Sequence, residues 1–103
     1  MYIIGDIGNT EVKICLFSIN KKLIKKISLK TDLINSKYLK KNLSSFIKKN
    51  TIINNIIFSS VVPKVYSLIN FYFTKSLKIK CNEIKKLKLN KLIKKNFVEF
   101  FKK

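Results

Sequence analysis

The chain has 103 residues, of which 47% are apolar; this length suits one small domain, and this composition excludes a disordered tail. There is no histidine, and the two cysteines, Cys15 and Cys81, lie far apart, which excludes the usual Cys/His zinc sites and any histidine-based catalytic triad. The net charge of +18 points first to nucleic acid or an anionic membrane surface as a partner.

The basic charge comes from lysine alone. All 23 basic residues are lysine, whereas proteins that bind nucleic acid depend heavily on the planar guanidinium group of arginine. Lysine, isoleucine and asparagine, whose codons are rich in A and T, fill about half of the chain. We therefore attribute much of the charge to a small, AT-rich genome such as that of an endosymbiont.

Nucleic acid is not expected as a partner, but a basic nucleic-acid-binding module remains the alternative. It would be favoured if the paired lysines of the first half converged on one face. These are Lys21, Lys22, Lys25, Lys26, Lys40, Lys41, Lys48 and Lys49.

Neither membrane insertion nor secretion is expected. No stretch approaches the roughly 18 apolar residues that span a bilayer, and Asp6 interrupts the place where the apolar core of a secretory signal would lie. We expect a cytoplasmic protein in which Cys15 and Cys81 are reduced core thiols rather than a disulfide.

The amino-terminal part of the chain predicts a meander of strands. A first strand is predicted at residues 2–8, which begin with the short apolar run Tyr2-Ile3-Ile4. Residues 11–18 alternate between apolar and polar side chains, as a half-buried strand does. A turn at residues 20–22 precedes a third strand at residues 23–30. The short connections favour antiparallel pairing.

Two helices are predicted in the middle of the chain. The first runs from about Ser36 to Lys49, and the second begins at Pro63, where the missing N–H costs nothing. Their apolar residues recur at the spacing of one helix face: Leu39, Leu43, Phe46 and Ile47, then Val65, Leu68, Ile69, Tyr72 and Phe73. We interpret the aromatic residues among them as core rather than as a stacking platform for bases.

Two further strands are predicted. Residues 52–62 are apolar on both faces, which is typical of a central strand, and the Asn54-Asn55 pair places its start near residue 55. A short candidate strand covers Leu77 to Cys81.

The chain is divided into a main domain of residues 1–82 and a lysine-rich amphipathic tail of residues 83–103, which is expected to be helical. A helix packed on the domain is the plainer interpretation, and a membrane-surface or partner-binding helix is the alternative. The apolar residues of this helix are Leu89, Leu92, Ile93, Phe97, Phe100 and Phe101.

The segment Gly5-Asp6-Ile7-Gly8-Asn9-Thr10 carries the strongest chemical signal. Gly8 can adopt a backbone conformation that other residues avoid, Asn9-Thr10 offers hydrogen-bond donors, and Asp6 can reach Mg²⁺. Lys13 adds a cation of the kind that pairs with phosphate. The same residues also suit a plain β-hairpin turn, so the motif alone leaves both interpretations open.

Two stretches together resemble the amino-terminal half of the type III pantothenate kinases. The first is Asp6-Ile7-Gly8-Asn9-Thr10 with Lys13 and Leu16-Phe17, and the second is Ser59-Ser60-Val61-Val62-Pro63 between a strand and a helix. The resemblance reaches to about residue 80. It implies an α/β fold, half of an actin-like (ribonuclease H-like) ATPase domain with the order β-β-β-α-β-α-β plus a terminal helix.

The resemblance also implies roles. The family phosphorylates pantothenate with ATP in the first step of coenzyme A biosynthesis, works as a dimer and uses Mg²⁺ and a monovalent cation. Asp6 would act near the metal. The residues that would hold the ATP phosphates are Asp6, Ile7, Gly8, Asn9, Thr10, Glu11, Val12 and Lys13.

The sequence departs from the family in its catalytic part. It contains no arginine and no glycine after Gly8, so the family's Gly-x-Asp-Arg segment and second phosphate loop, together with the monovalent-cation site, are absent. Phosphoryl transfer depends on positioning and on stabilising charge together. We therefore expect no catalytic residue here and little or no kinase activity from this chain alone. It would be a truncated or decaying gene product, an interaction remnant, or one part of a split enzyme that needs a complementing second-half chain.

Overall fold

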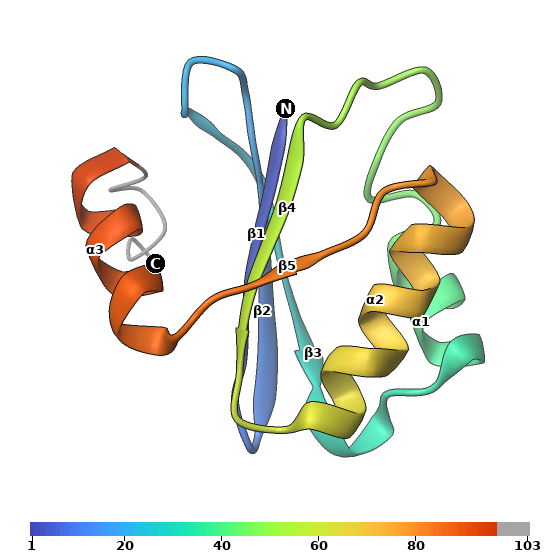
Figure 1. Cartoon of the computed structure of the whole chain (residues 1–103). Helices are drawn as coiled ribbons and strands as arrows, with labels where there is room; N and C mark the ends of the chain where they lie inside the picture. The colour runs from blue at the N-terminus through green and yellow to red at the C-terminus, as the bar shows by residue number, and fades with distance from the viewer. Residues whose placement is uncertain (97–103) are drawn as a thin grey trace.

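The computed structural model describes residues 1–96, which form one sheet between two layers of helices (Figure 1). Helices α1 (Ser36–Leu43) and α2 (Pro63–Leu77) cover one face of the sheet, and helix α3 (Lys86–Asn96) covers part of the other. This arrangement confirms the predicted α/β fold class. It also places α3 against the sheet, as the plainer interpretation of the terminal helix expected.

The sheet has five strands in the order β3-β2-β1-β4-β5. Strands β1 (Tyr2–Ile7), β2 (Glu11–Phe17) and β3 (Leu23–Lys30) form the predicted antiparallel meander. Strand β4 (Asn55–Ser60) runs parallel to β1 on its other side and carries β5 (Asn82–Glu83) at the edge. β1 therefore lies at the centre, between a partner nearby in the sequence and a partner far away.

The predicted strand at Leu77 to Cys81 is wrong. Leu77 is the last residue of α2, because it extends the row of apolar side chains formed by Val65, Ile69 and Phe73 at every fourth position. Lys78 then ends the helix in the left-handed conformation with a φ of 62°. The strand forms a few residues later, as β5.

Helix α1 is shorter than predicted. It begins after Asn35, whose side chain accepts a hydrogen bond from the backbone N–H of Tyr38 at 2.8 Å, and it ends at Leu43 rather than near Lys49. Phe46 is still buried, but a tighter turn brings it inward, since its N–H donates to the carbonyl of Leu43. The prediction was too long because the helical spacing of apolar residues continues to Phe46, beyond the last helical residue. A short 3₁₀ helix, η1 (Thr31–Leu33), links β3 to this region.

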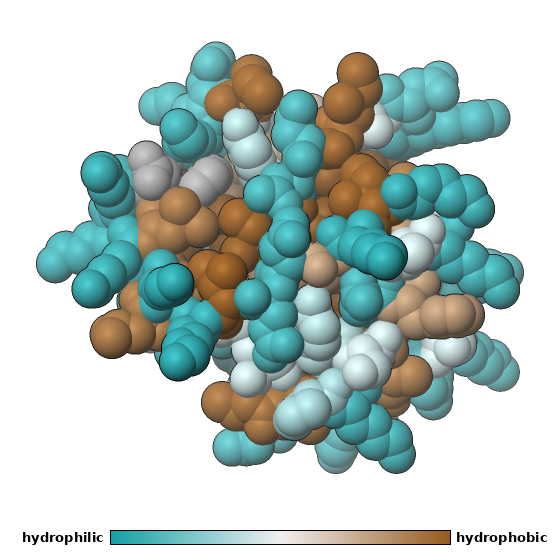
Figure 2. Space-filling view, in the orientation of Figure 1, coloured by the Kyte–Doolittle hydropathy of each residue, from teal (hydrophilic) through white to brown (hydrophobic). Residues whose placement is uncertain are grey.

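Two separate apolar clusters hold the layers together. The larger lies between the sheet and helices α1 and α2. The smaller joins Leu89 and Ile93 of α3 to Ile4, Cys15 and Phe17 of the sheet. In the space-filling view, apolar side chains show between α3 and the edge of the sheet, framed by hydrophilic ones (Figure 2).

Helix α3 begins at Lys86, and the predicted apolar residues Phe97, Phe100 and Phe101 lie outside the described residues. The division of the chain between residues 82 and 83 stays a prediction. Within the part of the chain that the structure describes, no helix is long and apolar enough to cross a bilayer.

Candidate functional site

The loop between β1 and β2 is a tight hairpin. The N–H of Gly8 donates to the carbonyl of Glu11 at 2.9 Å, which leaves Asn9 and Thr10 at the tip. Among the described residues no glycine has a positive φ. The prediction that Gly8 uses a backbone conformation closed to other residues is therefore wrong. A Cβ at Gly8 would lie 3.2 Å from the carbonyl oxygen of Glu11, a tight contact that a small shift of the hairpin would relieve.

Asp6 lies at the meeting point of three strands. In the sheet register its neighbours are Lys13 on β2 and Ser59 on β4. The hydroxyl of Ser59 donates to Oδ1 of Asp6 at 2.8 Å, and Ser59 itself is only 1% exposed. The two stretches that carried the family resemblance are thus joined directly, and a buried donor fixes the orientation of the carboxylate.

Lys86, the first residue of α3, is a partner of Asp6 that the sequence did not predict. Its ammonium group forms an ion pair with Oδ2 of Asp6, the carboxylate oxygen that Ser59 does not contact. Lys86 is 53% exposed and Asp6 25%. The two residues are 80 positions apart, so no local pattern could have paired them.

Thr31 supports the hairpin from behind and was also missed. Its N–H donates to the carbonyl of Thr10 at 3.1 Å, and its hydroxyl donates to the carbonyl of Gly8 at 2.9 Å. Thr31 is 6% exposed, so these bonds are shielded from water. A threonine after a strand is too common to signal this role, which depends on β3 returning to the hairpin.

Two hollows flank the hairpin. The one that contains Asp6 has a volume of about 280 Å³ and is lined by six of the predicted residues: Asp6, Gly8, Asn9, Thr10, Glu11 and Lys13. The predicted Ile7 and Val12 point into the larger cluster and are fully buried, so only their backbone groups could reach a ligand there.

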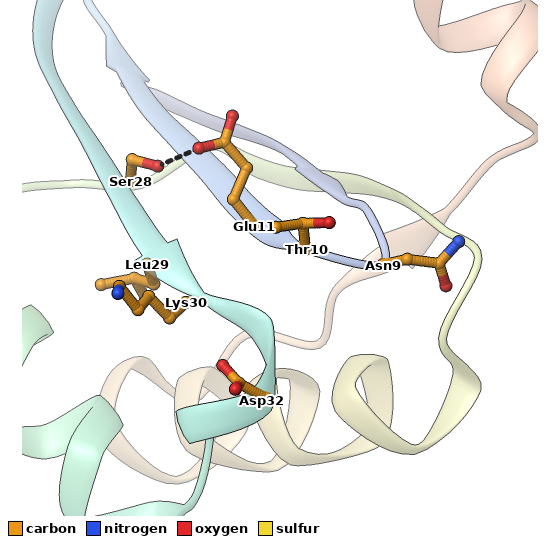
Figure 3. A pocket seen from close by; sticks show the side chains of 7 residues that line it. All are labelled: Asn9, Thr10, Glu11, Ser28, Leu29, Lys30 and Asp32. Carbon is orange, nitrogen blue, oxygen red and sulfur yellow. Dashed lines mark hydrogen bonds between the residues drawn. The ribbon is translucent and has the colours of Figure 1, made fainter.

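The second hollow is larger, about 520 Å³, and lies on the β3 side of the hairpin. Figure 3 shows Glu11, bonded to Ser28 at 2.8 Å, and Asp32 among the side chains around it. Each hollow is lined by two carboxylates and one lysine: Glu11, Asp32 and Lys30 in the larger, and Asp6, Glu11 and Lys13 in the smaller. Charge therefore does not separate the two hollows. The smaller one differs in containing Asp6, whose carboxylate is oriented by the hydroxyl of Ser59.

The donor set suits a metal ion only when the ion arrives with other ligands. No group of three or more His, Cys, Asp or Glu side chains capable of holding a metal occurs among residues 1–96. Mg²⁺ in nucleotide sites needs only one or two carboxylates, because phosphates and water complete its octahedral shell. Asp6 therefore fits Mg²⁺ bound to ATP and does not form a site for the free ion.

The cysteines take no part in this site. Both are free and buried, one in each apolar cluster. Burial raises the pKa of the Cys15 thiol to about 11 and that of Cys81 to about 12. Both thiols therefore stay protonated at neutral pH, and they lie in separate clusters on opposite faces of the sheet.

The paired lysines do not all converge. Lys25 and Lys26 are consecutive on β3 and so point to opposite faces of the sheet. The ammonium of Lys25 lies 3.5 Å from the carbonyl of Ser45, on the side of α1, whereas Lys26 lies opposite Cys15, whose side chain packs under α3. The condition that would have favoured a nucleic-acid surface is not met by this pair.

The sheet order, the hairpin between β1 and β2 and the acid held at its base define one half of an actin-like kinase domain. Comparison with known proteins agrees, since the model of the type III pantothenate kinase family matches residues 2–98. The chain belongs to this family. The match runs beyond residue 80, where the resemblance read from the motifs stopped, and takes in α3.

A relative from Pelagibacter ubique (strain HTCC1062), named a type III pantothenate kinase, is 51% identical over 94 residues. The alignment covers 91% of this chain but only 38% of the relative. The alignment with this chain thus covers little more than a third of the length of that relative. Neither comparison supports the nucleic-acid alternative.

Proposed function

We propose that this chain is the ATP-phosphate-binding half of a pantothenate kinase. The observation that carries the proposal is the position of Asp6 between Lys13 and Ser59 at the base of the hairpin. Asp6 would hold Mg²⁺ directly or through water, and Lys13 would contact phosphate oxygens. The N–H groups and side chains of Asn9-Thr10 would complete the cradle.

By itself the chain would bind Mg²⁺-ATP weakly and transfer no phosphate. The family resemblance assigns the acceptor hydroxyl and the monovalent cation to segments rich in glycine and arginine, which this sequence lacks. Without them the γ-phosphate has no positioned acceptor. Bound Mg²⁺ would neutralise phosphate charge; the residues of this chain would orient the nucleotide.

We further propose that a complementing chain, or a second copy of this one, covers the loop end of the sheet in the cytoplasm. Val61 is 60% exposed and its N–H bonds to Ile7 beside the hairpin; Leu87 is 69% exposed and follows Lys86. Both are large apolar side chains next to the polar site. A partner that covered this end of the sheet would remove both side chains from water.

Isothermal titration with Mg²⁺-ATP tests the nucleotide site. Relative to wild type, Asp6→Asn and Lys13→Met should each raise Kd by roughly tenfold or more, as expected for loss of a charged contact. Lys41→Met is the matched control, because Lys41 is an exposed lysine of α1, and it should change Kd less than about twofold. Absence of nucleotide binding by wild type, even with a complementing second half added, would refute the proposal.

A further inference from the structure

Both oxygens of the Asp6 carboxylate are already engaged. Ser59 donates to Oδ1 from the neighbouring strand, and the ammonium of Lys86 is paired with Oδ2. A metal ion that used this carboxylate would have to share or replace one of these partners. Ser59 is buried in the sheet, while Lys86 is half exposed on a long flexible side chain, so Lys86 is the partner that can leave.

The charge at the start of α3 favours the ion pair between Lys86 and Asp6. Lys86 is the first residue of α3, and the first turn of this helix contains no acidic residue, although a helix amino terminus favours negative charge. Lys85 and Lys88 add positive charge beside it. Asp6 supplies the anion that offsets this charge, and the packing of Leu89 and Ile93 on the sheet fixes the start of the helix within reach.

We propose that Lys86 is an internal counter-ion that occupies Oδ2 of Asp6 until Mg²⁺-ATP displaces it. The inference rests on the proposed nucleotide site and adds a regulatory contact to it. Mg²⁺ and the ammonium group compete for one carboxylate oxygen. Binding of the nucleotide therefore frees Lys86 and removes the anion that steadies the first turn of α3. The contact is autoinhibitory, and α3 is the element that responds.

The test compares Lys86→Met with Lys88→Met by titration of the intact chain with Mg²⁺-ATP and with ATP in excess EDTA. Lys88 is an exposed lysine in the same helical turn, so its variant matches the change of net charge without touching Asp6. Lys86→Met should tighten Mg²⁺-ATP binding by about threefold, the scale of a partly exposed ion pair. It should not tighten binding of metal-free ATP, and Lys88→Met should tighten neither.

A second pair of variants ties the effect to the carboxylate. In an Asp6→Asn background, Lys86→Met should have no effect on Mg²⁺-ATP binding, because there is no charge left to block. Hydrogen exchange of the first turn of α3 should rise when wild type binds Mg²⁺-ATP.

The outcomes separate this inference from the proposed function. If wild type binds Mg²⁺-ATP but Lys86→Met binds it equally or more weakly, Lys86 is a phosphate contact or a bystander, and the inference fails alone. If neither protein binds nucleotide under any condition, the proposed site fails and the inference fails with it. Unchanged exchange in α3 on binding would also overturn the displacement.

Discussion

The two faces of the sheet are built for different purposes. Under α1 and α2, the central strands present buried apolar side chains, such as Ile3 and Ile7 on β1, and Gly5 between them leaves room for Phe58. Under α3, the same strand presents Tyr2 and Ile4 toward one end and Asp6 at the other. One face is core throughout, and the other is core for half its length and polar site for the rest.

This difference shows how a small domain of this size can carry a charged site. The larger cluster stabilises the sheet, so the opposite face can carry Asp6 and Lys13, which contribute no apolar burial. The smaller cluster under α3 has a narrower task, which is to place the start of that helix beside the carboxylate. Changes on the two faces should therefore have different consequences.

Truncation of one core residue on each face gives the largest expected effects. Ile69→Ala on α2 should lower the free energy of unfolding by about 3–4 kcal/mol, because Ile69 is fully buried in the larger cluster. Leu89→Ala on α3 should cost about 2 kcal/mol and act mainly on the docking of that helix. Urea unfolding measures the first quantity, and hydrogen exchange resolves the second. If both variants lost the same free energy of unfolding, and hydrogen exchange rose equally in all elements, the two faces would not be distinct.

Gly5 sharpens the comparison from within the central strand. A Cβ at this position would lie 2.0 Å from Cε1 of Phe58, so Gly5→Ala should cost about 2 kcal/mol through overpacking on the α1 and α2 face. Gly8→Ala is the control, since its nearest contact would be 3.2 Å away and its φ is not positive; it should cost less than about 1 kcal/mol. Urea unfolding measures both variants. A larger loss of unfolding free energy in Gly8→Ala than in Gly5→Ala would show that the hairpin, and not the contact with Phe58, is the more tightly packed position.

Loss of the Thr31 hydroxyl, which bonds to the hairpin, should have a smaller effect on the free energy of unfolding and a clearer effect on nucleotide affinity. Thr31→Val keeps the shape but removes the hydroxyl that donates to Gly8, which should cost about 1 kcal/mol and weaken Mg²⁺-ATP binding. Thr31→Ser retains the donor and should stay close to wild type in affinity. If the two variants bound nucleotide alike, the hydroxyl would have no role in positioning the loop.

Ionisation of the two thiols gives the smallest expected effect on stability. Because one thiol lies on each face, it allows the two faces to be compared without removing core side chains. Burial raises the pKa of Cys15 to about 11 and of Cys81 to about 12, above the ordinary value of 9.0. The contribution to stability is therefore full below pH 9 and is lost as pH rises through these values. Between pH 8 and 9.5 the free energy of unfolding should fall by about 0.8 kcal/mol per thiol.

Cys15→Val and Cys81→Val, one on each face, should each flatten the alkaline part of the stability profile. Thermal unfolding between pH 7 and 9.5 provides the measurement, with wild type as the reference. A profile that neither substitution changed would mean that the thiols are not protected from ionisation in the folded state.

The sequence predicted those parts of the fold that depend on local pattern. Alternating side chains located the meander, and Pro63 located the start of α2. The misplaced strand at residues 77–81 shows the limit, because Leu77 satisfies both a short apolar run and the four-residue spacing of the helix before it, and packing decides between them. In the candidate site, residue types left Asp6 to Lys13 open between a phosphate loop and a plain hairpin, the family resemblance favoured the phosphate loop, and the role of these residues stays a prediction. Thr31 and Lys86 could not be identified from the sequence, since each reaches the hairpin from a distant element.

The central position of β1 has a consequence for the order in which this site is assembled. Its hairpin with β2 is local and can close within microseconds, whereas its parallel pairing with β4 must first close a loop that separates Asp6 from Ser59 by 53 residues. We therefore expect the hairpin to form early in folding as an isolated turn, with Asp6 at its base not yet oriented. Asp6 gains Ser59 only when β4 pairs with β1, and Lys86 only when α3 docks on the sheet. Orientation of this carboxylate should therefore report completion of the sheet and its helices rather than formation of the loop itself.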